Sequence, residues 1–183
     1  LGKGHVQSWV IGSGVPSSSD DGAGEDIQRE TIAVLLEHYA LADDDSTEGR
    51  QRNAEAYAMP PIMVDAGALS LLPAHVPAQV VITPHAGELA ALLNRLHHND
   101  TDSPLTPQDI QAEPLRYATM AHELTGATVL LKGAITMVVG TDEEKRSRVI
   151  LSGRAPAWLS TAGAGAYNPA DGAVAVVKEY NTV

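Results

Sequence analysis

The chain has no cysteine and no phenylalanine, and its aromatic residues are limited to two Trp and five Tyr among 183 residues. Without thiols there are no disulfide bonds and no thiolate chemistry, which fits a reducing cytoplasm. Without Phe, a hydrophobic core has to be built from Val, Leu, Ile and Ala. The apolar fraction of 44% is ordinary for a globular protein, and the length suits a single domain.

Basic residues are also scarce, because 12 Lys and Arg stand against 23 Asp and Glu and leave a net charge of −11. This balance argues against nucleic acid and against an anionic membrane surface as partners. The chain has no run of 18 apolar residues, so no membrane-spanning helix is expected. A phosphorylated small molecule stays compatible, since backbone dipoles bind phosphate even in an acidic protein. We therefore expect a soluble, cytoplasmic protein that acts on small molecules.

Short apolar strands alternate along the chain with amphipathic helices. Such alternation predicts an α/β fold with a mostly parallel central sheet and helices on both faces, in one domain over residues 1–183. The predicted strands are residues 6–11, 62–65, 80–82 and 128–131, followed by a hairpin of 135–139 with 148–151. The predicted helices are residues 26–42, 49–57, 89–96 and 107–125, the last one capped by Thr106 and stopped by Gly126.

Most polar and glycine motifs follow directly on predicted strands, where parallel α/β sheets bind ligands. Taken singly, each has a simpler explanation as a turn glycine, a helix cap or a solvated charge. Together, a lysine and a glycine-rich helix start suit a phosphorylated ligand, because the ammonium supplies a point charge and the N–H groups supply directed donors. The motifs are Gly12-Ser13-Gly14, Asp65, Thr83-Pro84-His85-Ala86-Gly87-Glu88, Lys132-Gly133 and the stretch from Ser160 to Gly165.

Motifs for metal binding and for nucleophilic catalysis are missing from the sequence. His97 and His98 are adjacent, so their side chains diverge, and no metal ligands are predicted. Neither a G-x-S-x-G elbow nor a G-x-x-x-x-G-K-[ST] loop is present.

Five segments in a fixed order resemble one known family. They are Val10-Ile11-Gly12-Ser13-Gly14, the run V-D-A-G-A-L at 64–69, I-T-P-H-A-G-E-L at 82–89, L-L-K-G-A-I-T at 130–136 and S-T-A-G-A-G at 160–165. The set is similar to the ADP- or ATP-dependent NAD(P)H-hydrate dehydratases of the ribokinase-like superfamily. The resemblance extends over residues 6–165, and the pairing of T-P-H-x-G-E with L-K-G-x-x-T is its most specific part.

This resemblance implies a cofactor-repair lyase that phosphorylates the ring hydroxyl of the S epimer of hydrated NADH or NADPH and then eliminates phosphate. ADP or ATP would be the phosphate donor, with Mg²⁺ accompanying it, and the chain would assemble as a homo-oligomer. Gly14 and His85 would contact the hydrated nucleotide, and Asp65 and Glu88 would have supporting roles. The adenine nucleotide would be held by Lys132, Gly133, Ala134, Ile135, Thr136 and Gly165.

Two departures from the family pattern concern catalysis. The family carries an aspartate directly after the second glycine of G-x-G, as the expected base, whereas this chain has Ala166 followed by Tyr167-Asn168-Pro169. The family's N-terminal part before the Gly12 strand is also absent. Either the chain is degenerate, or segments are missing at the N-terminus and near 165–166; the loss of whole blocks favours the second explanation. No catalytic residue is therefore assigned.

Two alternatives to the dehydratase remain open at this point. One is a small-molecule or sugar kinase of the same superfamily, which would transfer phosphate to a stable alcohol without elimination. The other is an inactive module that binds AMP or ADP through residues 132–136.

Overall fold

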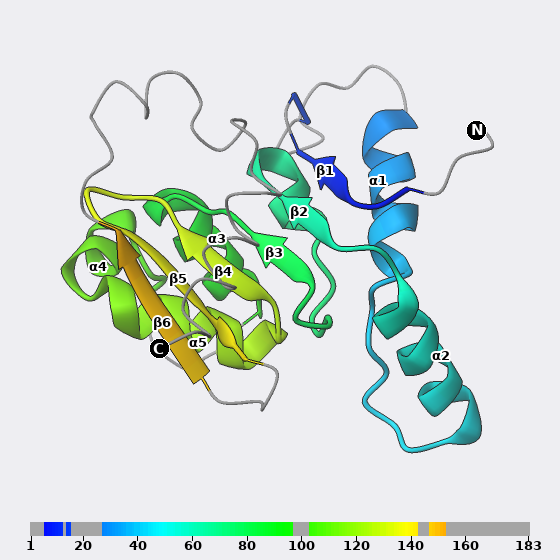
Figure 1. The fold of residues 1–183 in the computed structure, drawn as a ribbon. Coiled ribbons are helices and arrows are strands. Elements are labelled where there is room, and N and C mark those ends of the chain that lie inside the picture. The colour runs from blue at the N-terminus through cyan, green and yellow to red at the C-terminus, as the bar shows by residue number, and fades with distance from the viewer. Residues whose placement is uncertain (1–5, 13, 16–26, 97–102, 143–146, 153–183) are drawn as a thin grey trace.

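The computed structural model describes residues 6–12, 14–15, 27–96, 103–142 and 147–152, and Figure 1 shows their arrangement. Strands and helices alternate over the first two thirds of the chain. The strands are β1 (Trp9–Ile11), β2 (Ile62–Val64), β3 (Val80–Ile82), β4 (Thr128–Leu131), β5 (Thr136–Thr141) and β6 (Ser147–Ser152). The helices are α1 (Ile27–Glu37), α2 (Thr47–Ala58), the 3₁₀ helix η1 (Ala66–Leu71), α3 (Ala86–Leu96), α4 (Pro107–Ala112) and α5 (Pro114–Thr125).

The six strands form one sheet in the order β1-β2-β3-β4-β5-β6. The pairings from β1 to β4 are parallel, and β5 and β6 are added antiparallel. The α/β class with a mostly parallel sheet is thus confirmed, and so is the terminal hairpin. Its strands pair residue by residue from Thr136↔Ser152 to Thr141↔Ser147, which extends β5 past the end predicted from sequence.

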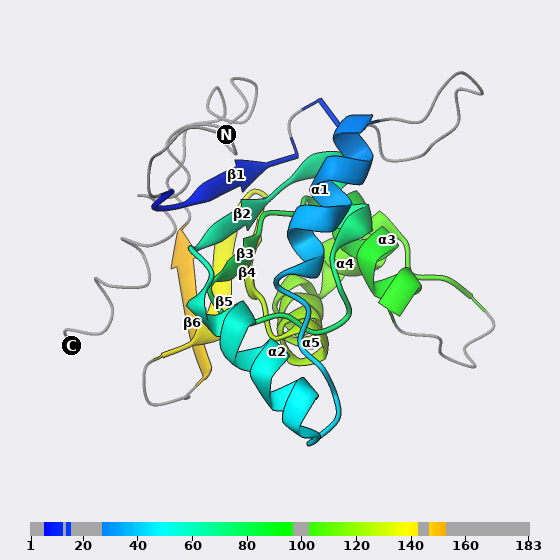
Figure 2. The ribbon, with the colours of Figure 1, turned by 90° about the vertical axis from the view of Figure 1, so that its right-hand side faces the viewer.

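Helices α1, α3 and α5 lie on one face of the sheet, as Figure 2 shows, and α4 packs on α3 and α5. The reason lies in the strand order. Because β1, β2, β3 and β4 are neighbours in sequence order, right-handed crossovers between them return on the same side each time. Helices on the opposite face stay a prediction.

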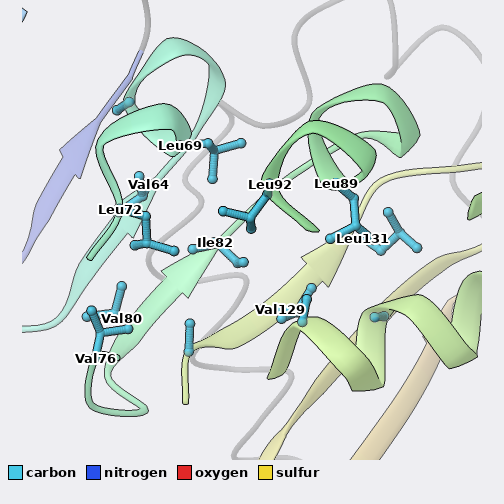
Figure 3. Packing of buried hydrophobic residues seen from close by; sticks show 14 of the residues in the cluster. Val64, Leu69, Leu72, Val76, Val80, Ile82, Leu89, Leu92, Val129 and Leu131 are labelled. Atoms are coloured by element: carbon cyan, nitrogen blue, oxygen red, sulfur yellow. The ribbon is translucent and has the colours of Figure 1, made fainter. Parts of the chain in front are cut away.

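The core lies between this face of the sheet and the helices (Figure 3). Alternate strand residues point into it, among them Val64, Ile82 and Val129, and all three are fully buried. From the helix side, Leu89 and Leu72 pack against them. Aliphatic side chains dominate this cluster, as the absence of Phe predicts.

The helix predicted over 107–125 is divided in two, and this part of the prediction is wrong. It begins as expected, with a capping box between Thr106 and Asp109 and with Pro107 in the first turn. Pro114 then ends α4 and starts α5, because proline lacks the N–H that a continuous helix would need there. Gly126, at a left-handed φ of 76°, ends α5 as predicted.

Other boundaries differ by a few residues. Pairing with β2 involves residues 9–11 alone, so β1 is shorter than the predicted 6–11. The 3₁₀ helix Ala66–Leu71 lies outside all the predicted helix ranges. Within the described residues, no helix combines the length and the apolar character that a membrane crossing requires.

Candidate ligand site at the carboxyl ends of the strands

Backbone hydrogen bonds continue past the ends of the parallel strands and bring the polar motifs side by side. A further bridge joins His85 to Lys132 in parallel register. The strand-end motifs at 65, 83–88 and 132 therefore meet at one edge of the sheet, as predicted. The three continuing bonds are donated by the N–H groups of Asp65 to Ile11 (3.0 Å), of Thr83 to Val64 (3.0 Å) and of Lys132 to Pro84 (2.8 Å).

Lys132 lies between two carboxylates at this edge. Its Nζ is 2.7 Å from Asp65 Oδ1 and 3.9 Å from Glu88 Oε2. The three side chains are between 22% and 29% exposed, so water screens the charges less than at an open surface. The ammonium is consequently fixed in place, and the interpretation of Lys132 as a merely solvated charge is wrong.

Asp65 is ionised in this arrangement. Burial raises the pKa of its carboxyl, but the hydrogen bond and the charge of Lys132, with help from the Thr83 hydroxyl and the Ala66 N–H, lower the pKa by more. The net pKa lies below the usual range of an aspartate. The next residue, Ala66, has a positive φ of 48°, an uncommon conformation for a residue other than glycine. Local backbone strain beside Asp65 is a feature often found at functional sites.

The lowered pKa of Asp65 makes a prediction about acid stability. Because the folded state holds the carboxylate more strongly than the unfolded chain does, the ion pair stabilises the fold above the unfolded pKa, about 3.9. That contribution is lost as the pH falls through the lower, folded pKa. Urea unfolding at about pH 6 and about pH 3 should show a smaller acid loss of stability in Asp65→Asn than in the parent.

The matched control for this prediction is Glu113→Gln, which removes an exposed carboxylate that pairs with Arg116. Its acid loss should equal that of the parent chain, since exposed ion pairs contribute little. Equal acid losses in Asp65→Asn and the parent would contradict the predicted role of the Asp65–Lys132 pair.

His85 and Glu88 form the N-terminal cap of α3. The His85 carbonyl accepts the first helical hydrogen bond, from Leu89 N–H, at 2.9 Å. Glu88 Oε2 accepts the His85 N–H at 2.8 Å, while His85 Nδ1 accepts the N–H groups of Gly87 (3.0 Å) and Glu88 (3.3 Å). This is a capping box in which histidine takes the usual place of Ser or Thr. The sequence interpretation of both residues as helix-start residues is confirmed.

Gly12 and Gly14 follow β1 and differ in their surroundings. Gly12 has a φ of 125°, and a Cβ added there would lie 1.8 Å from the carbonyl oxygen of Asp65. Gly14 has a φ of 80° and no described atom within 4 Å of such a Cβ. Gly12 is therefore required by the close approach of β1 to Asp65, whereas Gly14 is the exposed one of the pair.

The segment predicted to hold the nucleotide, residues 132–136, begins at the site with Lys132 and continues into β5. After Lys132, residues 133–135 form an exposed bend before β5 begins at Thr136. Ile135 is 53% exposed, which leaves an apolar surface beside the bend. Gly165 and the whole stretch 160–166, including Ala166, lie outside the described residues.

Thr83 stands in the predicted strand-end motif 83–88 but was not predicted to have a role of its own. Its side chain is 1% exposed, and its hydroxyl finds no hydrogen-bond partner of acceptable geometry among the described residues, although it is near enough to Asp65 to lower that residue's pKa. Buried hydroxyls are rarely left without a partner. The signal in the sequence was its position as the first polar residue after β3.

Fold and site together define an α/β protein with a candidate ligand site at the carboxyl edge of a mostly parallel sheet, around a fixed lysine and the start of α3. The family model described as NAD(P)H-hydrate dehydratase matches residues 3–166. The chain belongs to this family.

Relatives of known description are bifunctional NAD(P)H-hydrate repair enzymes. The chain is 30% identical to the one from Mycobacterium leprae and 31% identical to the one from Mycobacterium tuberculosis, over 168 residues in both cases. Each match covers 88% of this chain but 26% of the relative, so the chain spans about a quarter of the relatives' length.

A solved structure with partial likeness is the ADP/ATP-dependent NAD(P)H-hydrate dehydratase from Bacillus subtilis, co-crystallised with ATP and Mg²⁺. It is 18% identical and has a TM-score of 0.43, over 75% of this chain and 49% of that one. A likeness of this size adds nothing to the assignment, which rests on the family model.

Proposed function

We propose that this chain carries out the nucleotide-dependent dehydration of S-NAD(P)H hydrate to NAD(P)H. The observation that carries the proposal is the direct contact of two family motifs. His85 and Glu88 of T-P-H-x-G-E begin α3 beside Lys132 of L-K-G-x-x-T, and the Lys132 side chain reaches Asp65. The relatives described as NAD(P)H-hydrate repair enzymes support the same reaction.

In the proposed reaction, a phosphoryl group passes from ADP or ATP to the ring hydroxyl of the hydrate, and phosphate then leaves to restore the dihydronicotinamide. Lys132 would supply the positive charge that the donor phosphates need, and the exposed bend at 133–135 with Thr136 would lie along the nucleotide. His85 and Gly14 would contact the hydrated nicotinamide nucleotide. Asp65 would hold Lys132 in position through the 2.7 Å ion pair.

The proton of the ring hydroxyl needs an acceptor, and the described carboxylates at the site are already engaged. Asp65 binds Lys132, and Glu88 binds the His85 N–H as a cap. The family's aspartate would follow Gly165, where this sequence has Ala166. No base is assigned; higher turnover in Ala166→Asp than in the parent chain would show that a carboxylate at this position acts as the base.

Mg²⁺ would arrive with the nucleotide rather than occupy a dedicated protein site. The described residues contain no group of three or more potential ligands. Mg²⁺ is usually held by one or two carboxylates in addition to phosphate oxygens and water, and the described carboxylates at the site, Asp65 and Glu88, are engaged by Lys132 and by the His85 N–H. Held by the phosphate oxygens of the nucleotide, the ion would neutralise charge on the transferring phosphoryl group.

The test is conversion of purified S-NADHX, followed by recovery of dihydronicotinamide absorbance. We expect recovery when ADP or ATP is present and none when nucleotide is omitted. A chain that phosphorylates a stable alcohol and leaves S-NADHX untouched would be a kinase instead. A chain that binds ADP in calorimetry but turns over neither substrate would be an inactive nucleotide-binding module.

Assembly and location are further parts of the proposal. The family resemblance supports a homo-oligomer, which light scattering of the purified chain would test by its mass. The absence of cysteine and the acidic charge balance support a cytoplasmic location without nucleic-acid partners. Fractionation of cells that express the tagged protein would test that location.

A further inference from the structure

The α3 cap determines which nitrogen of His85 carries the ring proton. Two backbone N–H groups, those of Gly87 and Glu88, point at Nδ1 at 3.0 and 3.3 Å. A nitrogen that accepts hydrogen bonds cannot carry a proton of its own in that plane. The proton of the neutral ring is therefore on Nε2.

The other ring nitrogen is available to a ligand. His85 Nε2 is 3.5 Å from Glu88 Oε1, longer than a good hydrogen bond, and the His85 side chain is 59% exposed. The nearby carboxylate favours a proton on Nε2 over a lone pair. The ring thus has its acceptor nitrogen at the backbone of α3 and its donor nitrogen beside the Glu88 carboxylate, on a side chain that is 59% exposed.

We infer that His85 acts toward its ligand as a neutral hydrogen-bond donor through Nε2–H, and that the α3 cap excludes it as the general base for the ring hydroxyl. To act as a base at Nε2, the ring would have to move its proton to Nδ1 and break both bonds from the helix. This inference rests on the proposed function for its ligand, the nicotinamide nucleotide. An oxygen of that nucleotide would accept the Nε2–H bond.

The first part of the inference, the position of the ring proton of His85, is tested by ¹⁵N–¹H correlation NMR of the full chain. The chemical shifts of the imidazole nitrogens distinguish protonated from unprotonated nitrogens. The chain has seven His, and the spectrum of His85→Asn identifies the signals of His85 by their loss. We expect an unprotonated Nδ1 and a protonated Nε2. The opposite tautomer, or shifts averaged between the two, would overturn the inference.

The second part of the inference, that Nε2–H binds the ligand, is tested by two variants. One removes the donor at the Nε2 position, and the other removes the cap acceptor at the Nδ1 position. In His85→Asn, Oδ1 takes the place of Nδ1 and keeps the cap, but no donor remains at the Nε2 position. In His85→Gln, the longer amide places an N–H donor near the Nε2 position and leaves the cap without its acceptor. The probe is NADH, titrated by its own fluorescence.

We expect His85→Asn to keep the parent's unfolding midpoint and to bind NADH about 3- to 10-fold more weakly, which corresponds to one hydrogen bond. His85→Gln should show the reverse: a lower midpoint and near-parental binding. Equal NADH binding by His85→Asn and the parent, or no NADH binding by the parent, would overturn the second part of the inference. Failure to convert S-NADHX with NADH binding and tautomer as expected would count against the proposed function alone.

Discussion

Lys132→Met is expected to weaken ADP binding by about 10- to 100-fold, because a hydrogen bond to a charged group contributes about 1.5–3 kcal/mol. Lys132 is the cation that the described strand ends hold in place, 2.7 Å from Asp65 and 3.9 Å from Glu88. Methionine keeps the length of the side chain and removes its charge. Isothermal titration calorimetry with ADP and Mg²⁺ measures the loss.

The substitution also leaves Asp65 without its partner, and an unpaired, partly buried carboxylate destabilises the fold. The double variant Lys132→Met/Asp65→Asn removes that charge, so it should regain stability and not ADP affinity. Arg116→Met is the matched control, because it removes an exposed cation that pairs with Glu113 on the surface. ADP affinity equal to that of the parent in Lys132→Met would contradict the nucleotide role of Lys132.

Gly12→Ala is expected to lower the free energy of unfolding by about 3 kcal/mol or more, since backbone strain and overpacking cost about 1–3 kcal/mol each. The added Cβ would lie 1.8 Å from the Asp65 carbonyl oxygen, and the φ of 125° disfavours any side chain. Either β1 separates from β2 at this end, or Asp65 moves. Urea unfolding gives the stability change.

Gly14→Ala provides the comparison within the same turn. Its φ of 80° is also left-handed, but no described atom lies within 4 Å of the added Cβ. The cost should therefore be conformational alone, about 1–2 kcal/mol. If both variants lose the same free energy of unfolding, the close contact between Gly12 and Asp65 does not contribute to the loss, and the prediction for Gly12→Ala is contradicted.

Local features of this fold were predictable because neighbouring residues encode them. Hydrophobic periodicity located the parallel strands and most helices, and the Thr106 cap and the Gly126 stop appeared where they were predicted. The division of α4 from α5 was also encoded locally, in Pro114, but was overlooked. Strand lengths were less predictable, since β1 ends where its pairing with β2 ends.

By itself, the sequence determined the α/β class, the motifs after each strand and the family they resemble. The tertiary structure decided which of those motifs meet. Lys132 and Asp65 are 67 residues apart, and their ion pair depends on the register of β2, β3 and β4. Register is fixed by packing of one face of each strand into a shared core, so it follows from contacts across the sheet rather than from neighbouring residues. The same register buries Thr83 beside Asp65.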